Sequence, residues 1–236
     1  MAKLDGRYDW VVIAAASSQG GEKAYKKVYG LGSENIARWL KTAETQSVVC
    51  ISSTSVYRQT NAEWVSEGNT DIPENGTSKI LWDSEQTMSA ASPPVTILRS
   101  SGIYGPGRGH LFRQFMSGNT AIEGEGTRYL NMVHRDDLVG SIATVLELAK
   151  DSGLYNITDD EPVTQFAFYK WLSKATGCPM PPFVPEPDPS TRVRGLTNKR
   201  VSNKHFKESH GYKYKYPTFR EGFADEIKKG LKTAQG

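Results

Sequence analysis

The stretch "WVVIAAA", residues 10–16, decides the fold class of this 236-residue chain. An unbroken apolar run of this length predicts a strand buried on both faces, as in a parallel sheet. Apolar residues then recur at mostly helical steps over 22–44, which predicts an amphipathic helix. A second apolar run, "SVVCISS" at 47–53, predicts another buried strand. Strand, helix and strand in this order indicate a parallel sheet covered by helices.

The same alternation continues to about residue 150. After polar loop material we expect these elements in chain order: a helix at 78–91, a strand at 95–105, a helix near 110–117, a helix from Asp136 through Lys150, and a strand at 154–158. The last 80 or so residues look like a smaller lobe of mixed elements. Thr164 is expected to cap one of its helices, and Thr218 with Glu221 forms a capping box for the last helix.

Composition narrows the range of functions. The net charge is only +3, too weak to indicate a nucleic-acid partner. The basic stretch near 192–215, which includes Lys199 and Tyr214, is interpreted as a solvated lobe surface. Cys50, interpreted as a buried thiol, and Cys178 show no metal or disulfide spacing, which is typical of a reducing compartment. We find no signal peptide and no membrane-spanning run, so the expected location is the cytoplasm or an organelle stroma.

The pair Gly30-Leu31-Gly32 resembles half of a dinucleotide-binding loop. Such a loop must follow a strand directly and open a helix toward the pyrophosphate. Here the preceding residues are charged and helically periodic, and Asn35 stands where the third glycine is needed. We therefore place both glycines inside a helix, where close packing would explain them. No other stretch of the sequence has the G-x-G-x-x-G spacing.

Five motifs in order resemble a known group of enzymes: "DWVVIAAAS" (9–17), "VVCISSTSVY" (48–57), "TILRSSGIYGPGR" (96–108), "NMVHRDDLVGSI" (131–142) and "YNITDDEPVT" (155–164). They are similar to the extended and atypical short-chain dehydrogenase/reductases, nearest to the NAD(P)-dependent epimerase/dehydratase-like group. The resemblance runs from about residue 9 to about residue 225. It implies an α/β fold: an incomplete Rossmann-like domain with helices on both faces over 1–152, and a small substrate-type lobe over 153–236.

In that family "DWVVIAAAS" is the fourth strand, and the phosphate-binding glycines lie on the first. The resemblance thus implies a deficit on the order of 60 residues, from a fragment or from natural truncation. It would also leave the edge of the 10–16 strand exposed, and exposed apolar edges invite pairing. We expect a homodimer through this edge, or N-terminal residues that cover it.

The resemblance also implies site residues. Contacts to NAD or NADP fall to Ala14, Ala15, Ala16, Ser52, Gly102 and Ile103. Catalytic roles fall to Ser53, Lys79 and Tyr104, and substrate contacts to Arg108 and Asn131. A strand-end serine that satisfies the backbone explains Ser53 equally well, and a solvated charge explains Arg108. His134 and Asp137 match a family motif whose roles here are expected to be structural. No metal is expected.

The catalytic Tyr-x-x-x-Lys of the family is altered in this chain. Helical spacing puts those two residues on one face, where the lysine lowers the phenol pKa. In "NGTSK" Lys79 is present, but Asn75 stands in place of the tyrosine. An asparagine exchanges no proton near neutral pH, so Tyr57 or Tyr104 would have to replace it.

Two functions remain open. The first is an NAD(P)-dependent epimerase, dehydratase or reductase acting on a sugar-like or small carbonyl substrate. The second is a non-catalytic relative, a binding or regulatory module unable to hold a dinucleotide. Neither involves nucleic acid or a membrane.

Overall fold

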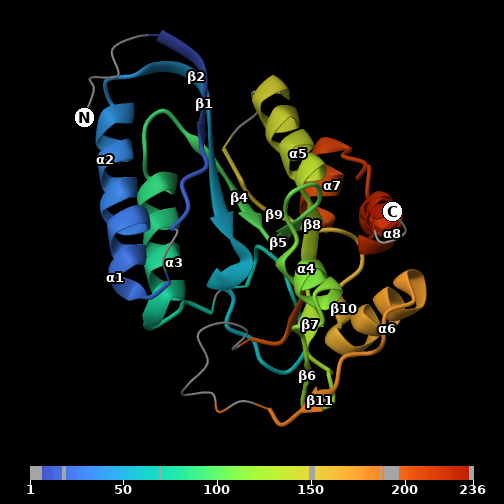
Figure 1. Cartoon of the computed structure of the whole chain (residues 1–236). Coiled ribbons are helices and arrows are strands. Elements are labelled where there is room, and N and C mark those ends of the chain that lie inside the picture. The colour runs from blue at the N-terminus through green and yellow to red at the C-terminus, as the bar shows by residue number, and fades with distance from the viewer. Residues whose placement is uncertain are drawn as a thin grey trace.

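A computed structural model describes residues 7–17, 20–69, 71–148, 152–186, 188 and 197–233 (Figure 1). The larger elements are strands β1 (Arg7–Ile13), β2 (Glu44–Ser53), β4 (Val95–Ser100) and β9 (Leu154–Ile157), and helices α1 (Glu22–Tyr25), α2 (Leu31–Leu40), α3 (Gly76–Ser89), α4 (His110–Met116), α5 (Arg135–Leu148), α6 (Gln165–Thr176), α7 (Lys204–His210) and α8 (Phe219–Thr233). The shorter pieces are the π-helix η1 (Lys26–Gly30), the 3-10 helix η2 (Thr54–Val56), and strands β3 (Glu63–Val65), β5 (Gly102–Tyr104), β6 (Ile122–Glu123), β7 (Tyr129–Leu130), β8 (Met132–His134), β10 (Val163–Thr164), β11 (Phe183–Val184) and β12 (Lys199–Val201).

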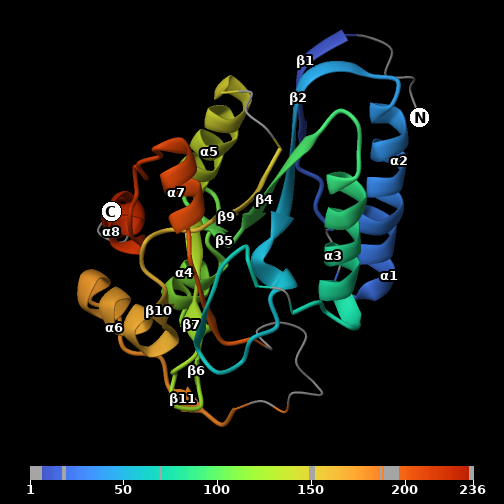
Figure 2. The same cartoon turned by 180° about the vertical axis from the view of Figure 1, so that it is seen from behind.

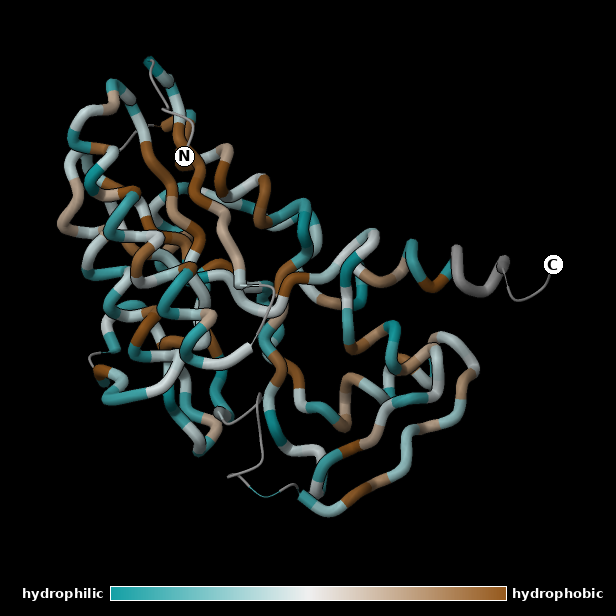
Figure 3. The backbone as a smooth tube through the Cα atoms, turned by 60° about the vertical axis from the view of Figure 1, so that its left-hand side comes forward, coloured by the Kyte–Doolittle hydropathy of each residue, from teal (hydrophilic) through white to brown (hydrophobic). Residues whose placement is uncertain are grey.

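The main sheet has four strands in the order β1-β2-β4-β9, all parallel. Val11 lies opposite Val48, and Val48 lies opposite Val95, so apolar residues line up across the sheet. All six residues of β4 are buried, including the polar side chains of Thr96, Arg99 and Ser100. In Figure 3 the strands of this sheet carry long apolar stretches. The predicted Rossmann-like α/β class is confirmed.

Helices cover both faces of this sheet (Figures 1 and 2). On one face α2 and α3 pack on the strands through Leu40 and Met88, in a cluster with Val48 and Ile97. On the other face α5 and α7 contribute Val145, Leu146 and Phe206 to a second cluster with Val49 and Leu98.

Strand β1 departs from the expectation of burial on both faces. Val11 and Ile13 pack against the α2–α3 cluster, but Trp10 is 54% exposed and Val12 45% exposed. The reason is position, because β1 forms the edge of the sheet while α5 contacts β2 and β4. The strand also ends at Ile13, so that residues 14–16 are exposed and lie beyond it.

The helix after β1 is nearly continuous from α1 through η1 to α2, and both glycines of the pair lie inside it, as predicted. The predicted reason for them is wrong. A Cβ built on Gly30 would meet nothing within 4 Å, and one on Gly32 only the Lys27 carbonyl at 3.9 Å. Close packing therefore requires neither glycine. Gly30 instead ends the π-helical turn, a local widening of the helix.

The second lobe has its own core, built from α4, α6 and α8 around Phe112, Phe168, Phe219 and Phe223. Both predicted caps are confirmed. The Thr164 hydroxyl accepts a hydrogen bond from the Ala167 amide, and the Thr218 amide donates to Glu221 at 3.0 Å. The two parts interlock, since β12 pairs with β3 and β9 belongs to the main sheet. The boundary at 152/153 stays a prediction.

Candidate functional site

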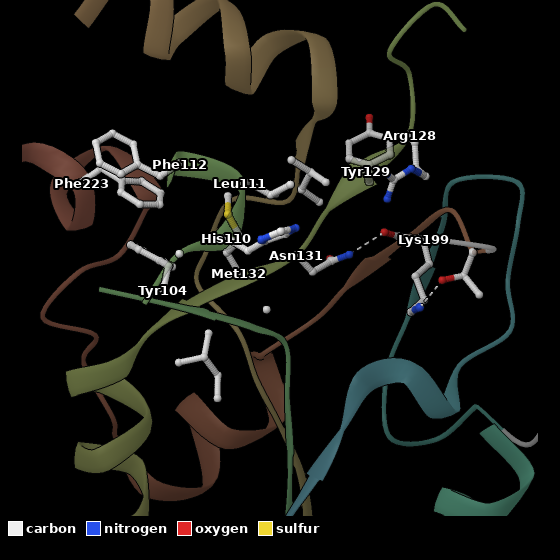
Figure 4. A pocket seen from close by; sticks show the side chains of 15 residues that line it. Tyr104, His110, Leu111, Phe112, Arg128, Tyr129, Asn131, Met132, Lys199 and Phe223 are labelled. Carbon is white, nitrogen blue, oxygen red and sulfur yellow. Dashed lines mark hydrogen bonds between the residues drawn. The ribbon is translucent and has the colours of Figure 1, made fainter. Parts of the chain in front are cut away.

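A pocket of about 280 Å³ lies where the second lobe meets the segment that follows β4. In parallel sheets of this kind, ligands bind outside the carboxyl ends of the strands. Figure 4 shows an aromatic end with Tyr104, Phe112 and Phe223, and a polar end with Asn131 and Lys199. The wall consists of Gly102, Ile103, Tyr104, Gly109, His110, Leu111, Phe112, Arg128, Tyr129, Leu130, Asn131, Met132, Thr197, Lys199 and Phe223.

Hydrogen bonds from the backbone and the side chain of Asn131 join the three segments that form the polar end. The Gly102 amide donates to the Asn131 carbonyl at 3.0 Å. The Asn131 side chain donates to the Lys199 carbonyl at 2.9 Å and accepts from the Val201 amide at 2.8 Å. A Cβ on Gly102 would lie 3.1 Å from the Asn131 carbonyl oxygen, so this close approach favours glycine. Asn131 thus fixes the geometry of the wall.

The polar end is positively charged. Lys199 is only 6% exposed, and its ammonium donates to the Thr197 hydroxyl at 2.7 Å. Burial lowers the pKa of Lys199 to about 8. Arg128 pairs with Glu123 at 3.6 Å. Among the described residues that line the pocket, none is acidic.

Tyr104 belongs to the aromatic end. Its ring stacks on Phe223 at 4.5 Å between centroids, and its hydroxyl donates to the Thr218 carbonyl at 3.3 Å. Burial, and to a lesser degree the charge of Asp159, raises the pKa of Tyr104. The hydroxyl is therefore protonated at neutral pH and faces the start of α8.

A much smaller cavity, about 30 Å³, lies between the ends of β1 and β2 and the helices α2 and α3. Its wall includes Ala15, Cys50 and Ser52. The Ser52 hydroxyl donates to Glu85 at 2.5 Å, so it is already engaged. Burial raises the pKa of the Cys50 thiol to about 12. This partly buried thiol is therefore not a reactive thiolate.

The structure brings some of the predicted site residues together and leaves others apart. Gly102, Ile103, Tyr104 and Asn131 share the large pocket, whereas Ala15 and Ser52 share the small cavity. Ala14, Ala16, Ser53, Lys79 and Arg108 line neither. No observation tests the roles predicted for these residues, so each role stays a prediction.

Ser53, Lys79 and Arg108 have local surroundings of their own. The Ser53 hydroxyl accepts from the Ser55 amide at 3.1 Å and caps η2. Lys79 pairs with Asp83 at 2.5 Å, one turn along α3. Arg108 is exposed, and its amide closes a turn onto the Gly105 carbonyl.

Asp137 has the structural role that we expected. Its carboxylate accepts from the Lys215 amide at 2.7 Å and from the Tyr216 amide at 2.9 Å. His134 is 2% exposed and accepts from the Asp136 amide at 3.1 Å. These contacts tie the start of α5 to the loop before α8. Within the residues that the structure describes, no group of His, Cys, Asp and Glu could hold a metal ion.

Sequence reasoning missed the polar end of the pocket. It assigned Lys199 and Tyr214 to a solvated surface, yet both are buried. Lys204 is exposed, as that interpretation requires, while Arg192 and Arg194 lie outside the described residues. The alternation along β12, which turns Lys199 and Val201 to one side, was the available signal.

Comparison with known proteins identifies the family. A sequence profile of the NAD dependent epimerase/dehydratase family matches residues 2–158. The chain belongs to this family. Protein YeeZ of Escherichia coli K12 is 30% identical over 171 residues, which are 72% of this chain and 58% of YeeZ. The chain therefore spans less than two thirds of the length of the curated relative that it matches.

Several solved structures share the fold of this chain. A functionally unknown conserved protein from Silicibacter pomeroyi has 26% identity and a TM-score of 0.75, covering 93% of this chain and 77% of that chain. Human epimerase family protein SDR39U1, solved with NADPH, has 19% identity and a TM-score of 0.76. The match covers 96% of this chain and 84% of that chain. UDP-glucuronic acid 4-epimerase from Bacillus cereus, solved with UDP-glucuronic acid and NAD, has 21% identity and a TM-score of 0.77. The match covers 94% of this chain and 76% of that chain.

The family assignment confirms the resemblance seen in the ordered motifs. At the identities of the last two structures, the likeness concerns the fold. A search of the described helices finds none with the length and apolar character that crossing a membrane requires.

Proposed function

We propose that this chain serves an NAD(P)-dependent epimerase, dehydratase or reductase reaction on a sugar-like or small carbonyl substrate. The observation that carries the proposal is the place of the large pocket. Its wall begins at Gly102, two residues beyond the end of β4, and the second lobe supplies the rest. A pocket between the carboxyl ends of parallel strands and a smaller lobe is where such a substrate would meet a cofactor.

The lining suits a small, partly polar substrate. Phe112, Met132 and Phe223 offer apolar surface, while Asn131 and Lys199 offer polar groups at the opposite end. The volume lies just below the usual range of roughly 300–1,000 Å³ for ligand pockets. This size favours a compound no larger than a monosaccharide over an extended one.

The chain suits the nicotinamide end of a dinucleotide better than its phosphate end. We assign the small side chains at Ala14–Ala16 and the backbone at Gly102 and Ile103 as contacts of the nicotinamide end, where hydride would be supplied or accepted. The junction before α1 does not suit phosphates, because the negative charge of Glu22 lies in the first turn of that helix. No phosphate site is therefore proposed at this junction.

Ser53, Lys79 and Tyr104 remain the proposed proton-handling residues, with Arg108 as a further substrate contact. A non-catalytic binding module is the second candidate, and it has an observation in its favour. The Asn75 amide oxygen accepts from Arg58 at 3.2 Å, and Lys79 is paired with Asp83. The two positions of the family's Tyr-x-x-x-Lys are thus each engaged elsewhere.

Titration of the purified chain with NADH and NADPH, followed by nucleotide fluorescence, separates the two candidates. Binding that weakens in Ala15→Leu and persists in Ala90→Leu supports the enzyme, since Ala15 lines the small cavity and Ala90 is exposed at the end of α3. Absence of binding at millimolar nucleotide would favour the non-catalytic module.

A further inference from the structure

Lys199 is the one lysine that is buried among the described residues, and it lacks a counter-ion there. Its ammonium can donate three hydrogen bonds, but the described residues supply a single acceptor, the Thr197 hydroxyl. Described lysines elsewhere in the chain, such as Lys79 and Lys207, pair with carboxylates at the surface. Burying a charge without a partner is costly. A site that keeps such a charge is prepared for a partner that the described residues do not supply.

The backbone of β12 holds this ammonium in place. Lys199 and Val201 point to one side of the strand, and Val201 packs in a cluster with Val56, Tyr57 and Leu81. Arg200 points to the other side, where its guanidinium lies over Trp64 at 5.2 Å and over Tyr129 at 5.3 Å. The two hydrogen bonds from Asn131 fix the strand itself. These contacts fix the side of β12 to which Lys199 points, and its side chain lines the pocket.

The charges around the pocket favour an anion. The lining residues that the structure describes include Arg128, Lys199 and His110 and no carboxylate. Arg128 already has Glu123 as a partner, so Lys199 carries the uncompensated charge. Lysine commonly binds phosphate and carboxylate groups as a point charge.

We propose that the Lys199 ammonium and the Thr197 hydroxyl form an oxyanion subsite of the large pocket, which takes a carboxylate or a phosphate ester carried by the substrate. This subsite names the class of substrate and rests on the proposed function of the pocket. The ammonium supplies charge and two free N–H donors. The Thr197 hydroxyl accepts from Lys199 and can turn its own proton toward the anion. The lowered pKa of Lys199 agrees with this arrangement, because an arriving anion would favour the charged form.

The experiment observes the amine directly. The full chain is labelled with [13C]lysine, and the Cε resonance of Lys199, identified by its loss in Lys199→Met, is followed against pH. Inorganic phosphate and malonate are the two probes, with sodium chloride at matched ionic strength as the reference. Each probe is raised to about 50 mM, well above the roughly millimolar affinity of one charge-assisted contact.

We expect at least one probe to raise the midpoint of the Lys199 titration by about one pH unit, equivalent to a tenfold preference for the charged form. Phosphate acting alone would indicate a phosphate ester, and malonate acting alone a carboxylate. Thr197→Val should reduce the effect several-fold. The resonance of Lys204, exposed and paired with Glu208, should respond to neither probe.

A Lys199 resonance that responds no more than that of Lys204 to both probes would overturn the subsite. The subsite would also be overturned if Thr197→Val left the response of the Lys199 resonance unchanged, since the Thr197 hydroxyl would then take no part in binding. The measurement needs neither a dinucleotide nor turnover. Failure of NADH and NADPH to bind, with the anion response intact, would therefore overturn the proposed function and leave the subsite standing.

Discussion

Glu85 of α3 and Arg99 of β4 form a two-point ion pair inside the protein. Arg99 Nε donates to Oε1 of Glu85 at 3.0 Å, and Arg99 Nη2 donates to Oε2 at 2.6 Å. The side chain of Arg99 is 1% exposed and that of Glu85 is 4% exposed. Arg99 Nη1 also donates to the Tyr57 hydroxyl at 2.9 Å, and that hydroxyl donates to Asn156. The network links α3, β4 and β9 below the strand ends.

Glu85→Gln should lower the free energy of unfolding by about 3–5 kcal/mol, because it leaves the buried Arg99 charge without a counter-ion. Urea unfolding followed by circular dichroism measures this loss. Asp83→Asn on the same helix is the matched control: its exposed pair with Lys79 should contribute less than about 1 kcal/mol. Equal losses in the two variants would contradict a special role for the buried pair.

Asn131→Leu should release β12 from the pocket wall. The variant removes both side-chain hydrogen bonds to β12 and leaves the Val201 amide and the Lys199 carbonyl without those partners. We expect a loss of about 1–3 kcal/mol in the free energy of unfolding and faster hydrogen exchange at Val201. Asn119→Leu, at an exposed loop position, is the control. Unchanged exchange at Val201 would show that β3 alone holds the strand.

Asp159→Asn should change how stability depends on pH. Asp159 is 1% exposed, and its Oδ2 has no hydrogen-bond partner among the described residues. Burial raises its pKa well above the ordinary value, opposed by the hydrogen bond from the Glu161 amide and reinforced by the charges of Glu161, Asp160 and Glu221. The folded state therefore retains a proton that the unfolded chain releases above pH 3.8 or so. The stability that this retained proton provides is complete in acid and is lost as the pH rises.

Relative to the unsubstituted chain, Asp159→Asn should thus gain stability between about pH 4 and about pH 7, by roughly 1–2 kcal/mol. Urea unfolding at both pH values measures the difference. Asp225→Asn, at an exposed position, should show no such trend. A gain that is equal at both pH values would mean that Asp159 is ionised in the folded state.

A second copy of the chain should pair along β1. This strand is the sheet edge, it exposes Trp10 and Val12, and a two-fold axis would let two such edges pair. Sedimentation should show a dimer that Val12→Lys converts to monomer. Val139→Lys, which alters a 58% exposed apolar residue on α5, should leave the dimer intact. A monomer at all concentrations would contradict the pairing.

Periodicity was sufficient for the elements whose surroundings are uniform along their length. The apolar run at 47–53 predicts a strand buried inside the sheet, and β2 pairs with β1 on one side and β4 on the other. It was insufficient for β1, because the sequence of a strand does not reveal whether it lies at the edge of a sheet. The same run of residues suits a central strand and an edge strand.

Some residues of the candidate site could likewise be predicted from the sequence, and others could not. Gly102 and Asn131 belong to ordered motifs, so the resemblance could place them in the site. Lys199 has neighbours that are mostly polar or charged, and local pattern favours the surface for it. Its burial comes from pairing with β3 and from Asn131, contacts made across long stretches of chain. Such contacts leave no local signature.

The hydrogen bonds of Asn131 have a consequence for the order of folding. They close contacts between residues 68 and 70 positions apart in the chain, and closing long loops costs entropy before any contact compensates it. The parallel pairs of the main sheet from β1 to β4 are all complete in the chain before residue 101. During synthesis the sheet can therefore form while the pocket is still open. Lys199 of β12 and then Phe223 of α8 complete the pocket wall, so the ability to bind a ligand is the last property that the folding chain acquires.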